Sequence, residues 1–353
     1  MSFARFMELA LYHPEHGYYA SGARRTGWGG HFVTSPELDP AFGELWCGGF
    51  GQVWTACGRP PVFEVVEVGG GEGAFAAAVL SAAPPQFGRA LRYRLVEPVG
   101  ALRGRQRKRL EGFAGVTWST RLEDLGPIEC GCVIANEVLD NQPVHLVERS
   151  GGEVRELRVV VRDGDLELTH APLPEGLARR LRAWGLEPRA GGRVEAPVAA
   201  ERLVRRAAGL LRRGTVMLVD YGLEAGELAA RPAGTVASYS EAGADDLVLD
   251  RPGAKDITAH VNWTLVRRWL REAGLVAVGP LHQRDVLRAL GSAAIAERLA
   301  AERRSAERAG RGAAAVRALS RRQALGALED PSGLGGLGVM IGLAGIKEVA
   351  FAT

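Results

Sequence analysis

Lysine, net charge of either sign and long apolar runs are all scarce in this chain of 353 residues. Lysine occurs only at Lys108, Lys255 and Lys347, although lysine and arginine together number 44. Because alanine and glycine are abundant as well, we attribute this bias to the base composition of the genome rather than to function. The 41 acidic residues nearly cancel the basic ones, so a net charge of +3 gives no reason to expect a nucleic-acid partner.

Cysteine is rare too, and its spacing does not match that of common zinc sites. The four cysteines are Cys47, Cys57, Cys130 and Cys132, and no two of them form a C-x-x-C pair. We therefore expect neither a structural disulfide nor a metal site. No stretch approaches the ~18 apolar residues that cross a bilayer. Arg5 and Glu8 interrupt the region where a secretory signal would need its apolar core. These absences predict a cytoplasmic protein with no membrane partner.

Apolar runs and helical patterns alternate along the chain from Val62 onward. Strands are predicted at 63–68, 93–97, 116–119, 132–135 and 216–221, and helices at 74–82, 102–110, 199–212 and 263–273. This alternation predicts a parallel sheet with helices on its faces, the α/β architecture of Rossmann-like folds. The stretch 293–328 is rich in alanine, arginine and glutamate and predicts surface helix, whereas the apolar 334–346 suits a buried terminal element.

Two regions do not follow this alternation of strands and helices. The first 60 or so residues are rich in aromatics, glycine and proline and show no long regular period except an amphipathic helix around 42–54, whose apolar face leaves homodimerisation open. The segment 144–174 alternates like antiparallel strands, with turn signals at Gly151-Gly152 and Asp163-Gly164. We therefore divide the chain into an N-terminal cap region (1–60), a core (61–145 and 214–353) and an inserted accessory region (146–213).

The strongest local motif follows the first predicted strand, where residues 67–73 read EVGGGEG. Gly69, Gly71 and Gly73 allow a sharp turn and a close approach of backbone to a ligand, and the predicted helix that follows contributes free N–H groups. The same run also fits the G-x-G-x-x-A pattern of dinucleotide-binding folds. The glycines alone leave open a dinucleotide loop, another nucleotide-like cofactor and a purely structural turn.

Acidic residues favour a cationic cofactor over a pyrophosphate. Glu67 lies two residues before the first glycine, where it would suit an amino-acid ammonium, and Glu97 ends the second strand, where it could accept hydrogen bonds from ribose hydroxyls. Asn136, Glu137 and Asp140 come at the end of the fourth predicted strand, at the sheet edge where ligands bind. They would repel nucleotide phosphates but suit a sulfonium. The alternative interpretation of residues 136–140 is structural: these residues cap the start of a helix, and their acidic side chains are exposed to solvent.

Many short motifs occur in order between residues 11 and 262. They are Leu11-Tyr12-His13-Pro14, Gly17-Tyr18-Tyr19, Phe32-Val33-Thr34-Ser35-Pro36-Glu37, Phe42-Gly43-Glu44, Glu67-Val68-Gly69, Leu95-Val96-Glu97-Pro98, Asn136-Glu137-Val138-Leu139-Asp140, Pro143-Val144, Asp220-Tyr221-Gly222, Gly234-Thr235-Val236 and Asp256-Ile257-Thr258-Ala259-His260-Val261. In this set the chain resembles the MidA-like methyltransferases, a family that includes the arginine methyltransferase that assists assembly of mitochondrial complex I.

The resemblance implies a class I methyltransferase fold that binds S-adenosyl-L-methionine (SAM). It implies that the glycine loop, Glu97 and the Asn136-Glu137 edge hold SAM, and that a turn formed by Thr34, Ser35, Pro36 and Glu37 closes over it. In the best-known members the acceptor is a protein arginine. Gly70 and Glu72 stand where the family usually has proline and arginine, and residues 237–243 keep Tyr239 but lose its usual polar neighbours. These departures leave SAM binding intact and put the usual acceptor in doubt.

Methyl transfer to a guanidinium would need carboxylates that orient it and accept charge, because its pKa lies above ~12. The candidates are Glu137, Asp140 and Asp220. Tyr18, Tyr19 and Tyr221 would shape the acceptor pocket, although core packing explains buried tyrosines equally well, and His260 is a candidate base or a structural histidine.

Three readings of the function follow from these patterns. The number of motifs favours a protein-arginine methyltransferase as the first. A small-molecule N- or O-methyltransferase, favoured by the departures at Glu72 and 237–243, is the second. The third is a non-catalytic assembly or interaction protein that retains the fold. An oxidoreductase that uses NAD comes last, because no Tyr-x-x-x-Lys or His/Asp pair is apparent.

Overall fold

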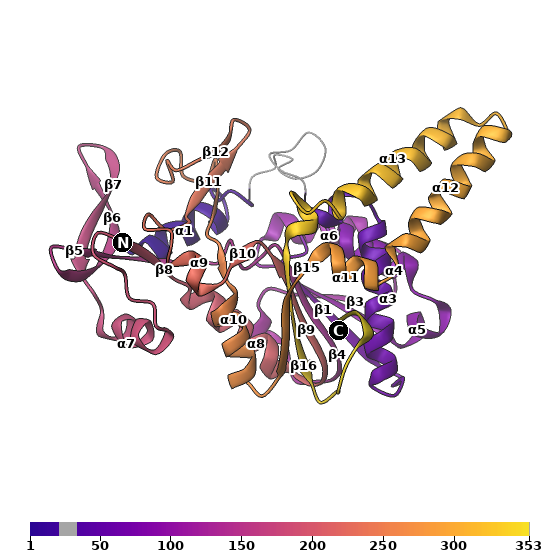
Figure 1. The fold of residues 1–353 in the computed structure, drawn as a ribbon, viewed down its shortest axis with the longest axis horizontal. Coiled ribbons are helices and arrows are strands. Elements are labelled where there is room, and N and C mark those ends of the chain that lie inside the picture. The colour runs from indigo at the N-terminus through magenta and orange to yellow at the C-terminus, as the bar shows by residue number, and fades with distance from the viewer. Residues whose placement is uncertain (21–33, 353) are drawn as a thin grey trace.

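The computed structural model describes residues 1–20 and 34–352, and a seven-stranded sheet lies at its centre (Figure 1). The strands of this sheet are β1 (Phe63–Val68), β2 (Leu91–Val96), β3 (Val116–Ser119), β4 (Ile128–Asn136), β9 (Leu211–Asp220), β15 (Val276–His282) and β16 (Gly338–Ala344). Their order is β15-β16-β9-β4-β1-β2-β3. β16 runs antiparallel to both of its neighbours, and the other pairs are parallel. The α/β class predicted from the sequence is confirmed.

Helices cover both faces of this sheet. One face packs against α3 (Ala41–Ala56), α4 (Ala74–Ala82), α5 (Pro85–Ala90) and α11 (Gln283–Ala289), and the other against α8 (Val198–Leu210) and α10 (Trp263–Glu272). Neighbouring residues of one strand, such as Val65 and Val66, are both fully buried but belong to opposite faces, because side chains alternate along a strand. Burial on both sides explains why the central strands β4, β9 and β16 contain long apolar runs.

The N-terminal region contains a helix, α1 (Phe3–Tyr12), that the sequence analysis did not predict. The expectation of no regular period in this stretch was wrong. Its buried residues follow helical spacing and are Phe3, Phe6, Met7, Ala10 and Leu11. A helix of ten residues is marginal by itself, and packing against the strands β5 (His145–Ser150), β6 (Glu153–Arg162) and β13 (Asp256–Thr258) makes it favourable.

The predicted amphipathic helix is α3, and its apolar residues lie inside the protein. Phe42, Trp46 and Phe50 are fully buried in the core beneath the central sheet. Gly43 permits close packing on α4, since a Cβ there would lie 2.4 Å from the side chain of Ala78. The helix therefore leaves no broad apolar face for a second copy, and homodimerisation stays a prediction without this support.

The segment 144–174 forms antiparallel strands, as predicted. The accessory sheet has the order β7-β6-β5-β8, with β5 (His145–Ser150), β6 (Glu153–Arg162), β7 (Asp165–Pro172) and β8 (Arg193–Ala196). Its two hairpin turns lie at the predicted pairs, and all four turn residues have positive φ. α7 (Glu175–Trp184) packs beside it. Figure 1 shows this sheet at the opposite end of the molecule from α12 and α13, described below.

Two small sheets lie between the accessory sheet and the central sheet. The first pairs β10 (Gly222–Leu223) with β14 (Val261–Asn262). The second has the order β12-β11-β13, with β11 (Ala237–Ser240), β12 (Gly243–Asp245) and β13 (Asp256–Thr258). The remaining short elements are α2 (Ser35–Leu38), α6 (Gly100–Arg109), α9 (Ala225–Leu228), η1 (Leu122–Asp124), η2 (Leu334–Gly336) and η3 (Ala350–Ala352).

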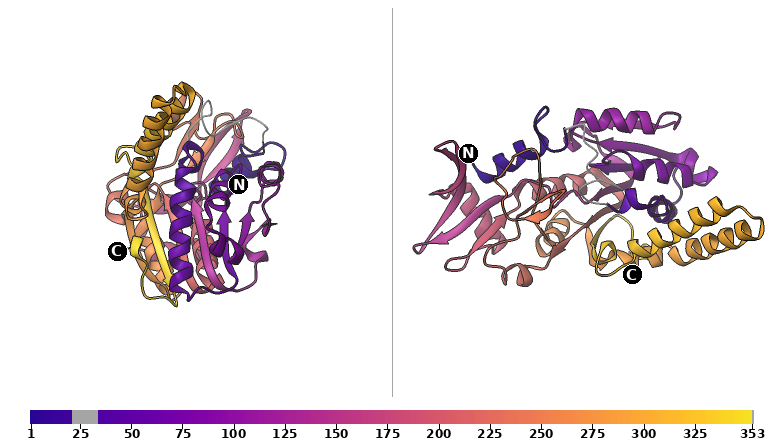
Figure 2. Two further views of the ribbon diagram at one scale, coloured as in Figure 1. Left: turned by 90° about the vertical axis from the view of Figure 1, so that its right-hand side faces the viewer. Right: turned by 90° about the horizontal axis from the view of Figure 1, so that it is seen from above.

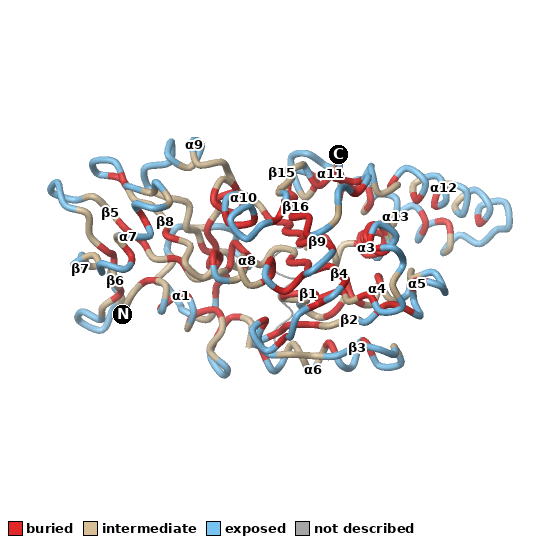
Figure 3. Tube along the Cα trace, turned by 90° about the horizontal axis from the view of Figure 1, so that it is seen from below, coloured by how far each residue is buried: buried red, intermediate tan, exposed pale blue. Residues whose placement is uncertain are grey.

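The predicted surface helix at 293–328 is a pair of helices, α12 (Ser292–Arg308) and α13 (Gly312–Leu328). They pack on each other as a hairpin that projects from the body (Figures 1 and 2). Most of the hairpin is exposed, whereas buried segments run through the central strands and α3 (Figure 3). Within the described residues, no helix has both the length and the apolar character needed to cross a membrane. The division into cap, core and accessory regions stays a prediction.

Candidate active site

The glycine loop lies directly after β1 and begins α4. Gly69, Gly71 and Gly73 have φ of 67°, 50° and 82°, the left-handed conformation that favours glycine. The N–H of Gly69 donates to the carbonyl of Val96 on β2 at 2.9 Å, which holds the loop against the neighbouring strand. A Cβ on Gly71 would meet no atom within 4 Å, so this part of the backbone faces open space in a cavity.

Glu67 lies beneath the loop. Its Oε2 accepts a hydrogen bond from Tyr93 Oη at 2.7 Å, and a Cβ added to Gly70 would lie only 2.9 Å from its Oε1. A side chain at position 70 would therefore push the Glu67 carboxylate from its present position. Burial raises the pKa of Glu67 to about 7. A buried carboxyl with so high a pKa favours a cation that would restore its charge.

Glu97, at the end of β2, forms the next part of the site. Its Oε1 accepts a hydrogen bond from the N–H of Val99 at 3.0 Å, and burial raises its pKa to about 7. Gln106, which was not predicted as a site residue, lies beside Glu97 and lowers its pKa. Gln106 on α6 donates to the carbonyl of Gly71 at 2.9 Å and accepts from Trp118 Nε1 at 3.1 Å. Gln106 is a lone uncharged polar residue in a run of arginines, and that contrast is the signal that could have identified it.

The end of β4 brings Asn136 and Glu137 to the same edge of the sheet. Glu137 has a positive φ of 52°, a strained conformation that local contacts maintain. Its Oε1 accepts hydrogen bonds from Asn136 Nδ2 at 3.0 Å and from the N–H of Ser35 at 3.2 Å. Burial raises the pKa of Glu137 to about 7. Asn136 Oδ1 is buried and has no hydrogen-bond partner among residues 1–20 and 34–352.

Asp220 and Asp140 have different surroundings, although both are buried. Asp220 Oδ2 accepts hydrogen bonds from the N–H groups of Val138, Leu139 and Asp140, at 3.1, 2.8 and 3.2 Å. Burial and the Asp140 charge raise the pKa of Asp220. Backbone N–H groups occupy both carboxylate oxygens of Asp220, and Asp220 lines neither of the two cavities of the site. Asp220 therefore positions the turn that carries Asp140.

Asp140 is buried but lines a cavity at this edge. Its Oδ2 accepts a hydrogen bond from Tyr221 Oη, while its Oδ1 is buried without a partner in the described part of the chain. Burial raises the pKa of Asp140 to about 6, against the opposing effect of the Tyr221 hydrogen bond. An unpartnered carboxylate oxygen in a cavity is a site for a donor from a ligand.

The tyrosines and the histidine proposed for the acceptor pocket separate into two groups. Tyr19 and Tyr221 line a cavity, whereas Tyr18 is fully buried in the core formed with α1. His260 packs edge-on against Tyr221, with ring centroids 5.4 Å apart, and does not line either cavity. Burial lowers the pKa of His260, which favours its neutral form.

Asp256, on β13, was not singled out by the sequence analysis. It accepts hydrogen bonds from Tyr19 Oη, at 3.1 and 3.2 Å, and from Asn141 Nδ2 at 2.9 Å. Burial raises its pKa, and the Asp140 charge adds to this effect. Asp256 is the first residue of the Asp-Ile-Thr-Ala-His motif. It is far along the chain from the other acids of the site, so nothing in the sequence indicates that it lies beside them. Asp256 joins the acidic cluster through tertiary contacts.

The Thr34–Glu37 turn begins α2 and covers this edge of the sheet. Thr34, Pro36 and Glu37 line the smaller cavity, and Ser35 Oγ lies 3.1 Å from the donor nitrogen Nε2 of the buried Gln283. Thr34 is the N-cap residue by position, but its side chain makes no capping hydrogen bond. Phe32 and Val33 of the same motif lie outside the described residues.

Two cavities meet at the glycine loop. The larger, of about 650 Å³, extends from Gly69 and Glu97 past η1 toward α1 and α8. The smaller, of about 280 Å³, is lined by acids and tyrosines. Its polar lining residues are Tyr19, Thr34, Glu37, Glu67, Glu72, Asn136, Glu137, Asp140, Asn141, Tyr221, Tyr239, Asp256 and Thr258. Both cavities are lined by Tyr19, Gly69, Gly71, Glu137 and Asn141, so one elongated ligand could extend from one cavity into the other.

Solved structures that resemble this chain include a ligand-bound relative. A protein from Burkholderia thailandensis bound to S-adenosyl-homocysteine superposes with a TM-score of 0.85, at 31% identity, covering 100% of this chain and 90% of that one. A second crystal structure from the same organism gives a TM-score of 0.82 at 30% identity, covering 100% of this chain and 89% of that one. These similarities agree with the Rossmann-like class I methyltransferase fold and with SAM as cofactor.

Curated relatives are named as arginine methyltransferases. The chain is similar to "Protein arginine methyltransferase NDUFAF7, mitochondrial" of Xenopus tropicalis, with 27% identity that covers 82% of this chain and 71% of the relative. The Danio rerio protein of the same name is 28% identical, covering 82% of this chain and 73% of the relative.

A family model matches residues 48–281, about two thirds of the chain, and is described as "Putative S-adenosyl-L-methionine-dependent methyltransferase". The match includes the glycine loop, the strand ends that carry Glu97 and Asn136, and the acidic residues Asp140 and Asp256. The chain belongs to this family and is a SAM-dependent methyltransferase.

Proposed function

We propose that the methyl acceptor is the guanidinium of a protein arginine and that the smaller cavity receives it. The observation that carries this proposal is the unpartnered Oδ1 of Asp140, a residue that lines a cavity together with further acids and with Tyr19, Tyr221 and Tyr239. A guanidinium presents planar donors that suit carboxylates and can stack on aromatic rings. The arginine acceptor named for the relatives supports the same assignment.

The residues around the glycine loop would hold SAM. Glu67 would attract its amino-acid ammonium, Glu97 would accept hydrogen bonds from its ribose, and Asn136 Oδ1 would accept a hydrogen bond that no described residue donates. Gly71 leaves room for the cofactor, because its Cβ position is empty. When bound, SAM supplies an electrophilic methyl group on a sulfonium. These residues fit it by charge and by space.

Asp140 and Glu137 would act on the acceptor nitrogen. Their carboxylates would orient the guanidinium, and Asp140 would accept the proton that the attacking nitrogen loses. Tyr221 fixes Asp140 through its hydroxyl, and Asp220 fixes the backbone that carries it. The α2 turn would exclude water from the same edge, which strengthens these interactions. In this scheme Glu137 and Asp140 touch the acceptor, whereas Asp220 and Tyr221 position them.

Labelled SAM and a proteome of arginine-containing proteins would test the acceptor. The purified protein, SAM bearing a labelled methyl group and a cell extract are combined, and mass spectrometry locates the label. We expect label on arginine side chains of one or a few proteins, incorporated about a hundred-fold more slowly when Asp140→Asn replaces the wild-type chain. Label confined to small metabolites, with SAM bound normally, would overturn the arginine assignment.

A small-molecule amine or phenol is the second candidate acceptor. The observation in its favour is the size of the smaller cavity, which at about 280 Å³ accommodates a single side chain or a small molecule equally well. The same labelled reaction separates the two candidates, since it reports which molecule receives the methyl group.

We also propose a reducing, cytoplasmic location for this chain, although the named relatives are mitochondrial. All four cysteines are free and buried. Burial raises the pKa of Cys47 to about 12 and that of Cys57 to about 11, which keeps both thiols protonated and unreactive. Fractionation of the native cell with an antibody against the chain would test the location.

A further inference from the structure

The small sheet β12-β11-β13 forms the outer wall of the smaller cavity. Tyr239 on β11 and Asp256 on β13 face each other in the strand register, and both line the cavity. Asp256 also accepts hydrogen bonds from Tyr19 and Asn141, which belong to other parts of the chain. The position of this short sheet therefore sets the positions of Tyr239 and Asp256 in the cavity wall.

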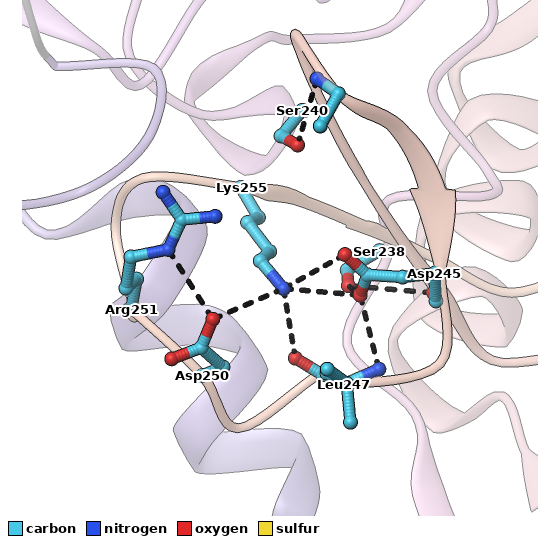
Figure 4. A network of polar contacts seen from close by, with 8 residues as sticks. Ser238, Ser240, Asp245, Leu247, Asp250, Arg251 and Lys255 are labelled. Carbon is cyan, nitrogen blue, oxygen red and sulfur yellow. Dashed lines mark hydrogen bonds and ion pairs between the residues drawn. The ribbon is translucent and has the colours of Figure 1, made fainter.

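A buried lysine connects this sheet to the loop between β12 and β13 (Figure 4). Lys255 is only 2% exposed and is one of three lysines in the chain. Its Nζ donates to Asp245 at 2.9 and 3.0 Å and to the carbonyl of Leu247 at 3.2 Å, and it lies 3.4 Å from Asp250. Ser238 Oγ donates to the same Asp245 carboxylate at 2.5 Å.

The contacts of Lys255 add side-chain support to strands that already pair with one another. Asp245 ends β12, Ser238 lies in β11 and Lys255 directly precedes Asp256 at the start of β13. Strands of two to four residues form few backbone hydrogen bonds, so side-chain contacts contribute much of their order. A buried ammonium that loses its partners is strongly unfavourable, which makes this arrangement resist rearrangement. Adjacent Cα atoms lie ~3.8 Å apart, so holding Lys255 also holds Asp256.

We propose that Lys255 is a positioning residue for the acceptor end of the site. Its ammonium clamps Asp245 and Asp250 and thereby sets Tyr239 and Asp256 at the cavity wall. The proposal rests on the proposed function insofar as the smaller cavity receives the acceptor. It assigns Lys255 no contact with SAM, since Lys255 lines neither cavity.

Hydrogen–deuterium exchange of the protein bound to S-adenosyl-homocysteine tests this without any acceptor. Lys255→Met removes the charge and keeps an unbranched side chain, Lys255→Arg keeps the charge, and Lys108→Met, on the exposed α6, is the control. In Lys255→Met we expect about ten-fold faster exchange at 237–240 and 256–258, with β1 and β4 unchanged. Lys255→Arg should lie closer to the wild type. If Lys255→Met does not fold, Asp245→Asn weakens the same contacts from the more exposed side.

Kinetics supply the second measurement. Lys255→Met should raise KM for the acceptor about ten-fold and leave Kd for SAM within about two-fold, because the change concerns the acceptor wall alone. Wild-type exchange in both segments would overturn the proposal, and so would faster exchange spread evenly over the central sheet. If the exchange pattern holds while no arginine is methylated, the acceptor assignment fails and the positioning role of Lys255 stands.

Discussion

Buried carboxyl groups dominate the chemistry of single residues in this site. Burial raises the pKa of Glu67, Glu97 and Glu137 to about 7 and that of Asp140 to about 6. Burying four acids close together destabilises a fold unless a partner compensates them. In the described structure no lysine or arginine donates a hydrogen bond to their carboxylates, although the charges of Arg103 and Arg105 lower the pKa of Glu97. We infer that the compensating charges come from ligands, a cationic cofactor and a cationic acceptor.

Gly71→Arg tests the glycine loop at this scale. The new side chain would enter the space where the Gly71 Cβ position is empty, so we expect SAM affinity to fall about a hundred-fold or more. Calorimetric titration with SAM and S-adenosyl-homocysteine measures it. Gly151→Arg is the matched control, because Gly151 has a similar φ of 59° and open space but lies in an exposed hairpin turn. Equal SAM affinity in Gly71→Arg and wild type would contradict the assignment of the loop.

Asp140→Asn tests the proposed proton acceptor. The amide keeps the shape of the side chain but cannot accept the proton, so we expect kcat to fall about a hundred-fold while Kd for SAM changes little. Steady-state kinetics with the identified acceptor and calorimetry with SAM measure the two quantities. Asp163→Asn, in an exposed turn, is the control. An unchanged kcat would remove Asp140 from the mechanism.

At the scale of elements, α2 depends on a helix far away in the sequence. Asp39, which follows α2, is buried and accepts hydrogen bonds from Arg321 on α13, at 3.0 Å to Nε and 3.1 Å to Nη2, and from the N–H of Ala41 at 2.8 Å. Ser35 within α2 donates to Glu137. The α12–α13 hairpin therefore supports the turn that covers the site.

Arg321→Met tests this support. The variant leaves Asp39 buried without its charged partner, so α2 should loosen and SAM affinity should fall about five-fold. Hydrogen exchange at 35–38 should quicken in parallel. Arg322→Met, at the exposed neighbouring position, should change neither quantity. If SAM affinity and exchange both stay at wild-type values, α13 does not support the turn.

At the scale of the whole molecule, the acidic site links stability to pH. The three glutamates have pKa values of about 7 in the folded protein against an ordinary 4.5, so the folded state binds more protons than the unfolded state between these values. Below about pH 4.5 these groups do not lower the free energy of unfolding. As pH rises from there through about 7, they lower it progressively. A bound cation favours the ionised carboxylates and offsets the loss.

Thermal unfolding from about pH 5 to about pH 8 measures this linkage. We expect Tm of the protein alone to fall across the window and the rise in Tm on adding SAM to grow. S-adenosyl-homocysteine, which lacks the sulfonium charge, should give a smaller growth. Glu67→Gln should flatten the slope of the ligand-free protein. A ligand-free Tm that rises from about pH 5 to about pH 7 would contradict the raised pKa values.

Much of the core could be predicted from the chain because its signals are local. The apolar runs of β1 and β3, the glycines after β1 and the two hairpin turns of the accessory sheet appear at their predicted positions. The short strands β11 and β13 were missed, because three or four residues give no distinct period. The helix α1 was missed although its buried residues follow helical spacing, because the turn residues that come after it dominate the pattern of the N-terminal region. Ion pairs such as Lys255 with Asp245 leave no trace in the periodicity.

The residues of the site also fall into a group that the sequence predicts and a group that only tertiary contacts identify. The sequence by itself determined that Glu67, Glu97, Asn136 and Asp140 follow or end strands, and parallel strands bring such residues to one edge of a sheet. Only the tertiary structure decided that Asp220 caps a turn, that Tyr18 belongs to the core and that Asp256 joins the acids. The reason is physical: the edge of a parallel sheet follows from local pattern, whereas the partner of a buried polar atom depends on which distant segments pack around it.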